Sequence, residues 1–490
     1  MSIPVETFFL VPRAGGTLQQ QIQQVVAEAI LRGRLRAGEK LPSSRRLAAH
    51  LGVSRITVTL AYSELLSGDY LTSRGRSGYF VSDSAPRQPD FDLPEAEQRD
   101  TVDWDAITGL RYSQSPDLAK PDDWRSYPYP FIYGQADATL FDHQNWRLCA
   151  MRALGRRDFE ALTADYYTRD DPMLIEYIVR SILPRRGIVA RPEEVLLTMG
   201  AQNALWIAAQ VLLRPERLAV QENPSYPGLR VILDQTRCRT GFVDVDADGL
   251  PPENIPAAAD VVFTTASHHC PTNVTMPIAR RRDFLDRARR ENFVIVENDY
   301  EFELSFVKAA SPSLKSMDED GRVVYVGSFS KSLFPGLRLG YLVGSERFVR
   351  EARSLRATVL RHPPGHIQRT VAYFLAQGHY DTLLGRMSQA FKRRRTAMDE
   401  AIRTHDLKIA GQGGFGGSSF WMEAPGHIDC DALAVRLRSK GVLIEPGRLF
   451  FDPKAPKLNC YRLAYSSIAQ GRIADGLALI AEEIAESGLK

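Results

Sequence analysis

Hydrophobic and polar positions follow three different patterns along the 490-residue chain. Between residues 18 and 31, and again in two stretches that follow, apolar residues recur with the period of a helix, which predicts a group of short helices. Residues 83–123 contain few aliphatic residues and no sustained period, which is typical of a flexible tether. From about residue 127, β-rich apolar runs alternate with helical stripes, which predicts a three-layer α/β domain.

A helix, a tight turn and a second helix are predicted after residue 42. Ser43 or Ser44 can cap the first helix, which would end at Gly52, and Ser54 can cap the second. This is the plan of a helix-turn-helix, whose second helix presents its N-terminal residues to the DNA major groove. The predicted inward face of that second helix consists of Val58, Ala61, Tyr62 and Leu65.

Polar residues of the same region supply candidate DNA contacts. Residues 70–81 predict two short strands around a basic glycine turn, which is the wing that accompanies such helices. Residues 13–76 contain ten basic and four acidic residues, whereas residues 83–123 contain four basic and eleven acidic ones. This asymmetry favours nucleic-acid contact at the N-terminal part only, the alternative being a small helical domain with a solvated basic face. The candidate contacts are Arg45, Ser54, Arg55, Thr57, Thr59, Arg74 and Arg76.

The long C-terminal part is organised around one lysine. The β-branched run from Val323 to Val326 predicts a buried strand, and Lys331 follows it in a loop of Ser, Pro and Gly. A lysine that a strand delivers into a protected pocket can lose its charge and act as an amine nucleophile. Ser328, Ser330 and Arg338 around it are residue types that bind phosphate. Pyridoxal 5'-phosphate (PLP) needs this combination, although a surface lysine beside a serine-rich loop is the alternative.

Two segments resemble known families. The motif from Leu41 to Tyr62 is the core of a match over residues 17–82 to the winged helix-turn-helix of GntR-type regulators. The segment Ser-x-Ser-Lys-x-x-x-Pro-Gly-x-Arg-x-Gly around Lys331 resembles the cofactor-lysine segment of fold-type I aminotransferases. Together they resemble the MocR subfamily of GntR regulators over nearly the whole chain.

The resemblance implies a multidomain architecture. A winged helix-turn-helix would occupy residues 13–82 and a flexible acidic linker residues 83–125. Residues 126–490 would form an α/β three-layer fold-type I PLP-dependent transferase domain, with a small C-terminal α/β subdomain from about residue 380.

The resemblance also implies roles for residues outside the lysine segment. Backbone N–H groups at a predicted strand-to-helix turn would hold the phosphate, and they belong to Gly200, Ala201 and Gln202. Tyr226 would stack on the cofactor ring. Arg462, on a predicted strand, would bind an α-carboxylate with its planar guanidinium, unless it is simply paired with an acidic side chain.

The chain departs from the aminotransferase pattern in the loop of residues 264–273. Asn273 replaces a turn glycine, and asparagine tolerates the left-handed backbone that such a turn needs. Cys270 stands near where many aminotransferases place an asparagine on the ring hydroxyl. His268 is the candidate substitute, with a satisfied loop histidine as the alternative.

The partner of the cofactor's pyridine nitrogen is left open between two neighbours. Relatives have Glu-Asp-Asp-Tyr where this chain has Glu297-Asn298-Asp299-Tyr300, and Tyr300 would bind the ring hydroxyl. If the strand continues through residue 300, Asn298 lies on the same face as Tyr300 and meets the nitrogen. If the chain bends, Asp299 meets the nitrogen instead. A carboxylate is needed to keep the nitrogen protonated, so an asparagine there should weaken transamination.

By resemblance, the protein is expected to be a cytoplasmic bacterial transcription regulator that binds promoter DNA as a head-to-tail, domain-swapped homodimer. A small amino acid or amine would form an external aldimine with PLP and change promoter binding. The alternatives are an active PLP-dependent aminotransferase with a DNA-binding head, and a regulator that senses PLP itself. No apolar run is long enough to span a membrane, and five scattered cysteines without a C-x-x-C pair favour a reducing cytosol over a disulfide or metal framework.

Overall fold

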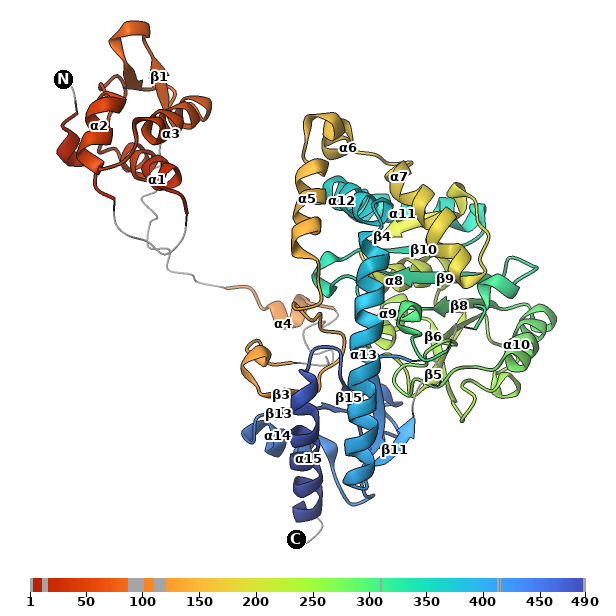
Figure 1. Ribbon diagram of the computed structural model, residues 1–490. Helices are drawn as coiled ribbons and strands as arrows, with labels where there is room; N and C mark the ends of the chain where they lie inside the picture. The colour runs from red at the N-terminus through yellow and green to blue at the C-terminus, as the bar shows by residue number, and fades with distance from the viewer. Residues whose placement is uncertain are drawn as a thin grey trace. The chain divides into compact units, whose positions relative to one another are not determined.

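The computed structural model describes residues 3–10, 16–86, 101–109, 120–308, 311–411, 414 and 416–487. The chain divides into two compact units, residues 1–109 and residues 110–490 (Figure 1). Parts of the predicted linker, residues 87–100 and 110–119, lie outside the described residues.

The packed part of the first unit is built from α1 (Leu18–Leu31), α2 (Ser44–Leu51), α3 (Arg55–Ser67) and the hairpin of β1 (Leu71–Ser73) and β2 (Tyr79–Val81). Of the two candidate caps for α2, Ser43 is the one used, because its hydroxyl accepts a hydrogen bond from the backbone N–H of Arg46. Gly52 ends α2 with a left-handed φ of 65°, and the Ser54 hydroxyl caps α3. The predicted inward face of α3 is confirmed, since all four of its residues are buried.

The packed part of this unit extends beyond the predicted limits of the domain. Ile3 and Phe8 are buried in the same core as α3, and the Ile3 N–H donates to the backbone carbonyl of Lys40. The domain therefore includes residues ahead of the predicted start at 13. Within the predicted linker, residues 104–107 form a short helix, α4 (Trp104–Ile107).

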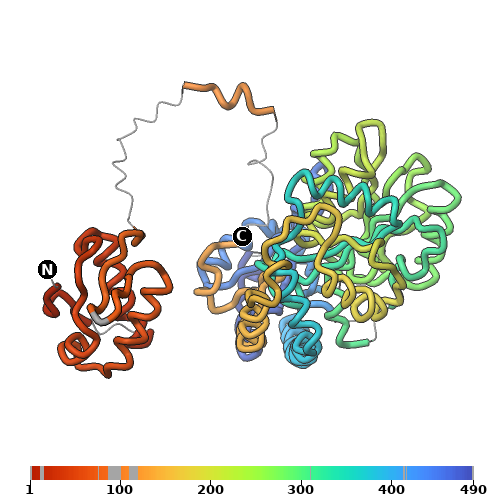
Figure 2. The backbone as a smooth tube through the Cα atoms, turned by 90° about the horizontal axis from the view of Figure 1, so that it is seen from above, coloured from red at the N-terminus to blue at the C-terminus, as the bar shows by residue number. Residues whose placement is uncertain are grey.

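The second unit begins inside the predicted linker. Trp124 is buried against Ile132 and Leu443, so the indole anchors the chain before the predicted domain start at residue 126. The strand that follows, β3 (Tyr129–Pro130), pairs in parallel with β13 (Val442–Leu443). Figures 1 and 2 accordingly show the orange segment that contains β3 against the blue C-terminal subdomain.

A seven-stranded sheet forms the centre of the large domain, with the strand order β4-β10-β9-β8-β7-β5-β6. Strand β10 is antiparallel to both of its neighbours, and the other pairs are parallel. The strands are β4 (Val195–Thr198), β5 (Leu218–Asn223), β6 (Arg239–Asp244), β7 (Val261–Thr264), β8 (Val294–Asn298), β9 (Val323–Ser328) and β10 (Gly340–Val343). The predicted buried strand ahead of Lys331 is thereby confirmed as β9.

Helices cover both faces of this sheet, which makes the predicted three layers (Figure 1). One face packs against α8 (Ala201–Leu212), α9 (Pro227–Thr236) and α11 (Glu346–Leu360). The opposite face packs against α10 (Ile278–Glu291), α7 (Pro172–Tyr177) and α12 (Gly365–Ala376). Two more helices, α5 (His143–Ala153) and α6 (Phe159–Thr163), precede α7.

The long helix α13 (His379–Thr404) connects the large domain to the small subdomain. The small subdomain is built on an antiparallel sheet with the order β11-β12-β15-β14. Its elements are β11 (Lys408–Gly411), β12 (Ser419–Glu423), α14 (Cys430–Ser439), β14 (Glu445–Pro446), β15 (Cys460–Ala464) and α15 (Ile473–Ser487).

Candidate cofactor and effector site

The candidate residues of the large domain converge on one edge of its sheet. Strands β5, β7, β8 and β9 are parallel, so their carboxyl ends meet there. The chain leaves β8 at Asn298 and β9 at Ser328, three residues before Lys331. Sequence reasoning expected these residues to act together, and parallel pairing is the reason that they lie together.

Lys331 faces a segment from the start of the domain. Its Nζ lies 4.1 Å from the centroid of the Tyr133 ring. A Cβ atom at Gly134, whose φ is 71°, would lie only 2.0 Å from this Nζ. Burial lowers the pKa of Lys331 to about 8, although the carboxylate of Glu301 acts to raise it. A larger fraction of the amine is therefore neutral and nucleophilic at a given pH than in an ordinary lysine.

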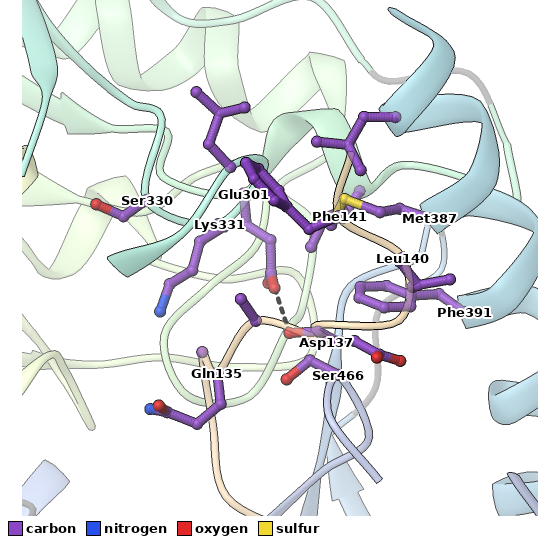
Figure 3. A pocket seen from close by; sticks show the side chains of 16 residues that line it. Gln135, Asp137, Leu140, Phe141, Glu301, Ser330, Lys331, Met387, Phe391 and Ser466 are labelled. Carbon is purple, nitrogen blue, oxygen red and sulfur yellow. Dashed lines mark hydrogen bonds between the residues drawn. The ribbon is translucent and has the colours of Figure 1, made fainter. Parts of the chain in front are cut away.

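A small cavity of about 30 Å³ adjoins Lys331 and Glu301. Figure 3 shows Lys331 and Ser330 on one side of it, with Met387 and Phe391 of α13 on the other. Glu301 is fully buried, its Oε1 accepts a hydrogen bond from the Ser418 hydroxyl, and its pKa is raised by burial. Sequence reasoning missed Glu301, because a single acidic residue after a strand carries no periodic signal.

The candidate phosphate ligands come together at the N-terminus of α8. Gly200 precedes this helix with a φ of 83°, and a Cβ there would lie 3.5 Å from the Arg338 guanidinium carbon. Arg338 itself has a φ of 52°, and its Nη2 donates to the Met199 carbonyl at 3.0 Å. The Ser328 hydroxyl accepts from the Ser330 N–H at 3.2 Å. Helix N–H groups and a guanidinium thus face one position, which suits an anion.

Strand pairing explains why residues so far apart in sequence meet at this position. Gly340 of β10 is opposite both Thr198 of β4 and Ser328 of β9. A Cβ at Gly340 would lie 3.0 Å from the Cα of Gly200 and 2.8 Å from the Gly327 carbonyl oxygen. Glycine at residue 340 therefore lets the α8 turn and the lysine segment approach closely.

Asn298 and Asp299 point in different directions. The Asp299 carboxylate accepts from Arg186 Nε at 2.6 Å and from the Tyr325 hydroxyl at 2.9 Å. The side chains of Arg186 and Asp299 are each only 1% exposed, so this ion pair is buried and inaccessible to solvent. The strand β8 ends at Asn298, whose buried Oδ1 has no hydrogen-bond partner among the described residues. Asn298 thus offers a buried acceptor without a partner among the described residues, whereas Oδ2 of Asp299 is held by Arg186 and Tyr325.

Tyr226 and Tyr300 pack against the same small cluster, which contains Cys270. His268 lies elsewhere: its ring is buried near Asp299 and Arg186, and neither of its nitrogens has a partner in the described part of the chain. Burial lowers the pKa of His268 to about 4, so the ring is neutral. Cys270, which stands near where many aminotransferases place an asparagine, packs in the same cluster as the two tyrosines.

The loop around residue 273 has the predicted backbone. Asn273 has a φ of 59°, which confirms that it adopts the left-handed conformation of the glycine that it replaces. Its Nδ2 donates to the Ser419 carbonyl at 2.8 Å. This contact connects the loop after β7 to the first residue of β12 in the small subdomain.

Arg462 lies on β15 and is almost fully buried. Its guanidinium carbon is 4.0 Å from the centroid of Tyr133 and 4.9 Å from that of Phe450. Its Nε donates to Glu445 at 2.7 Å, which is the ion pair that the sequence left as an alternative. The two terminal nitrogens make no hydrogen bond within the described residues. The sequence identified Arg462 but missed Tyr133 and Glu445.

The candidate DNA contacts of the first unit lie on its surface wherever their side chains are described. Arg45, Ser54, Arg55 and Thr59 are exposed, and Thr57 is half-buried. Two of the hydroxyls serve the helix: that of Ser54 accepts from the Thr57 N–H, and that of Thr59 donates to the Arg55 carbonyl.

The wing and one apolar side chain complete this surface. Arg74 stacks on Phe80 with its guanidinium carbon 4.7 Å from the ring centroid, while the side chain of Arg76 lies outside the described residues. Ile56, beside Arg55 at the start of α3, is 71% exposed and was not predicted. An exposed aliphatic side chain there is suited to contact the methyl group of thymine.

Each of the two units matches a known protein family. Residues 18–81 match the family of bacterial regulatory proteins of the gntR type, and residues 149–465 match aminotransferases of class I and II. The HTH-type transcriptional regulator TauR of Rhodobacter capsulatus is 59% identical over 99% of this chain and all of that protein. The probable rhizopine catabolism regulatory protein MocR of Rhizobium meliloti is 29% identical over 79% of this chain and 78% of its own.

Solved structures share the fold of the second unit. The kynurenine aminotransferase of Pyrococcus horikoshii superposes with a TM-score of 0.69 at 24% identity, over 78% of this chain and 98% of that one. The α-aminoadipate aminotransferase LysN of Thermus thermophilus gives the same score and identity, over 78% of this chain and all of its own.

The fold and the site therefore define a helix-turn-helix domain joined to an aminotransferase domain of class I and II. The chain belongs to the MocR-like transcriptional regulators of the GntR family. This membership implies DNA binding by the first unit. Over the described residues, every helix is too short or too polar to cross a bilayer.

Proposed function

We propose that this regulator holds PLP through Lys331 and changes its binding to promoter DNA when a small amino acid or amine takes the place of the lysine. The observation that carries the proposal is the position of Lys331. Its amine has a pKa of about 8 and lies at the sheet edge that also presents the α8 N-terminus, Arg338 and Asn298.

The residues at this edge fit the cofactor. The N–H groups that follow Gly200, together with Arg338, suit a phosphate, and the rings of Tyr226 and Tyr300 supply an aromatic wall. The carboxamide of Asn298, whose Oδ1 is buried, would meet the ring nitrogen, and the Asn298 Nδ2 would donate a hydrogen bond to that nitrogen in the unprotonated form. When bound, PLP supplies an aldehyde that captures amines and a ring that withdraws electrons.

Asn298 favours a sensor over an enzyme. A carboxylate beside the pyridine nitrogen would keep it protonated, and Asp299 is engaged by Arg186 and Tyr325 instead. A neutral carboxamide stabilises a positive charge on the ring less than a carboxylate does. Removal of a proton from the carbon that carries the amino group of a bound effector would therefore be slow. The site would then retain an amine effector without converting it.

Effector binding requires a movement near the attachment of the linker. The cavity beside Lys331, about 30 Å³, is far too small for an amino acid, and Tyr133 and Gly134 lie against the lysine. An effector must therefore displace this segment, which follows directly on β3 and on the buried Trp124. We infer that this displacement alters the start of the domain, where the linker joins it, and so changes how the DNA-binding units are presented.

On the DNA side, we propose that Arg55, Thr57 and the exposed face around Ile56 read bases, while Arg45, Arg74 and the wing contact phosphates. Ser54 and Thr59 would act mainly by shaping α3, since their hydroxyls are engaged by its backbone.

We also propose a homodimer, as the family resemblance implies. Apolar side chains on and around α5 and α6 support it: Leu148, Met151, Leu154 and Phe159 are all more than half exposed. Sedimentation equilibrium of the wild type and of a Met151→Glu variant would test this surface. A monomeric wild type would contradict the proposal.

The central experiment follows the absorbance of the PLP-loaded protein while amino acids, polyamines and taurine-like amines are added. In parallel, 2-oxoglutarate is supplied as the amino acceptor and the glutamate formed is assayed. Promoter affinity is measured by fluorescence anisotropy before and after each addition. Spectral change and altered DNA affinity without glutamate formation are expected. Sustained glutamate formation would instead establish an aminotransferase, and a difference in DNA affinity between cofactor-free and loaded protein alone would establish a PLP sensor.

Lys331→Ala tests the anchoring residue, with Lys408→Ala, an exposed lysine paired with Glu423, as the matched control. The Lys331 variant is expected to lose the lysine-linked absorbance band, and the Lys408 variant to keep it. A Lys331→Ala protein that retains the band would refute the proposal.

A further inference from the structure

The buried guanidinium of Arg462 has a carboxylate partner, Glu445. Glu445 is directly opposite Arg462 in the pairing of β14 with β15, and its Oε2 accepts from Arg462 Nε at 2.7 Å. The side chains are 15% and 4% exposed, so water screens their attraction only weakly. The pair is built into the sheet and holds the guanidinium in one orientation.

This arrangement leaves the other end of the guanidinium available. Only Nε is used by Glu445, and both terminal nitrogens lack a hydrogen-bond partner in the described part of the chain. Before an effector binds, the rings of Tyr133 and Phe450 contact the same group, which restricts its movement further. A guanidinium that is fixed in position, with its terminal N–H groups unused, is prepared to bind one anion end-on.

The length of an effector follows from the shared ring. Lys331 Nζ is 4.1 Å and the Arg462 guanidinium carbon 4.0 Å from the centroid of Tyr133, so the two groups are at most about 8 Å apart. An anion bound to Arg462 takes up about half of that distance. The amine and the anionic group of an effector that reaches both residues would therefore be separated by at most about four bonds.

Charge decides how many anionic groups the site accepts. Lys331 and Arg462 are matched by two carboxyl groups, Glu301 and Glu445, and both of these are close enough to raise the pKa of Lys331 against the effect of burial. The local balance is thus close to neutral before an effector arrives. One anion on Arg462 is compensated by the effector's own ammonium, whereas a second anion meets the field of Glu445 in a weakly screened site.

We propose that Glu445 is the positioning and charge-selecting residue of the effector site, and that it favours amino compounds with a single anionic group. Glu445 orients Arg462 through Nε and excludes amino compounds that carry two anionic groups. The inference rests on the proposed function for the identity of the site. It goes beyond that function in naming the residue that selects the effector by its charge.

Glu445→Gln is the discriminating variant, because a carboxamide oxygen still accepts from Arg462 Nε but carries no charge. Glu423→Gln on β12 is the matched control, since Glu423 is paired with the exposed Lys408 at 3.0 Å in the same sheet. The probes are β-alanine and L-aspartate, which differ by one carboxylate, titrated by absorbance into the PLP-loaded protein.

In the wild type and in Glu423→Gln, β-alanine is expected to bind more tightly than L-aspartate. In Glu445→Gln that preference should fall by about tenfold or more, with β-alanine affinity changed by less than about threefold. Glu445→Ala, which removes the acceptor as well, should weaken the binding of both probes. A preference that is unchanged in Glu445→Gln, or a wild type that prefers L-aspartate, overturns the proposal.

A second measurement separates failure of this inference from failure of the proposed function. Propionate and succinate have one and two carboxylates and no amine, so their stabilisation of cofactor-free protein in thermal unfolding reports on the anion site alone. Propionate, but not succinate, is expected to raise the melting temperature of the wild type, and both should raise that of Glu445→Gln. If amines give no spectral change, but the preference for propionate is present in the wild type and lost in Glu445→Gln, the proposed function fails and the selection by Glu445 stands. Equal effects of the two anions on both proteins would remove Glu445 as the selecting residue.

Discussion

Gly134→Ala tests how closely the Tyr133–Gly134 segment covers Lys331. An added Cβ would lie 2.0 Å from Lys331 Nζ, so the amine must retreat by about 1.5 Å to reach ordinary contact distance. The amine is the end of a flexible side chain and can move, so the added cost in folding stability is small. The position of the nucleophile nevertheless changes by more than its chemistry tolerates, because a misplacement of about 1 Å can cost about a hundredfold in rate.

Gly321→Ala is the matched control. Gly321 has the same φ of 71°, but a Cβ there meets no atom within 4 Å. Both variants place an L-residue in the left-handed region and should lose about 1–2 kcal/mol of unfolding free energy. Only Gly134→Ala also disturbs Lys331. The difference between the two variants therefore isolates the contact with the amine from the strain in the backbone.

Two assays are needed. Urea unfolding should give similar stabilities for the two variants, and the absorbance that follows addition of PLP to cofactor-free protein should develop about a hundredfold more slowly in Gly134→Ala alone. The reasoning is refuted if Gly134→Ala takes up PLP at the wild-type rate, or if Gly321→Ala shows the same loss. A much larger loss of stability in Gly134→Ala would show that Lys331 cannot move aside.

Two further predictions concern the charge of Lys331 and the DNA surface. In cofactor-free protein, Lys331→Met should be more stable than the wild type below pH 8, because there the folded wild type carries a buried ammonium whose pKa of about 8 is below the 10.5 of an ordinary lysine. The advantage should shrink between pH 8 and 10.5, where the folded wild type has lost this proton and the unfolded chain keeps it. Urea unfolding measures the difference in unfolding free energy between the two proteins, and a difference that stays constant with pH contradicts the low pKa. In the first unit, Arg45→Ala should weaken binding to all DNA and lower the salt slope by about one, whereas Arg55→Ala should cost about 1–3 kcal/mol mainly on the promoter sequence. Fluorescence anisotropy with promoter and unrelated DNA at several salt concentrations measures both effects, and unchanged affinity in both variants would contradict the assigned DNA surface.

The sequence by itself determined the elements whose causes are local. Ser54, Gly52 and the apolar period of α3 specify a capped helix after a tight turn, and the structure has that helix with the predicted inward face. The β-branched run before Lys331 likewise specified β9, and asparagine at 273 predicted the left-handed turn. Caps, periods and left-handed backbone depend on neighbours within a few residues, so the sequence contains the whole signal.

The tertiary structure alone decided which side chains face one another. The burial of Asp299 in an ion pair depended on where β8 ends and on Arg186, which is more than a hundred residues away in the chain. The pairing of Glu445 with Arg462 depended on the register of β14 against β15, and a shift of one residue would have turned either side chain to the other face. The cover of Tyr133 and Gly134 over Lys331 likewise joins segments about 200 residues apart. Such contacts are fixed by the packing of distant elements, and no local pattern of residues encodes them.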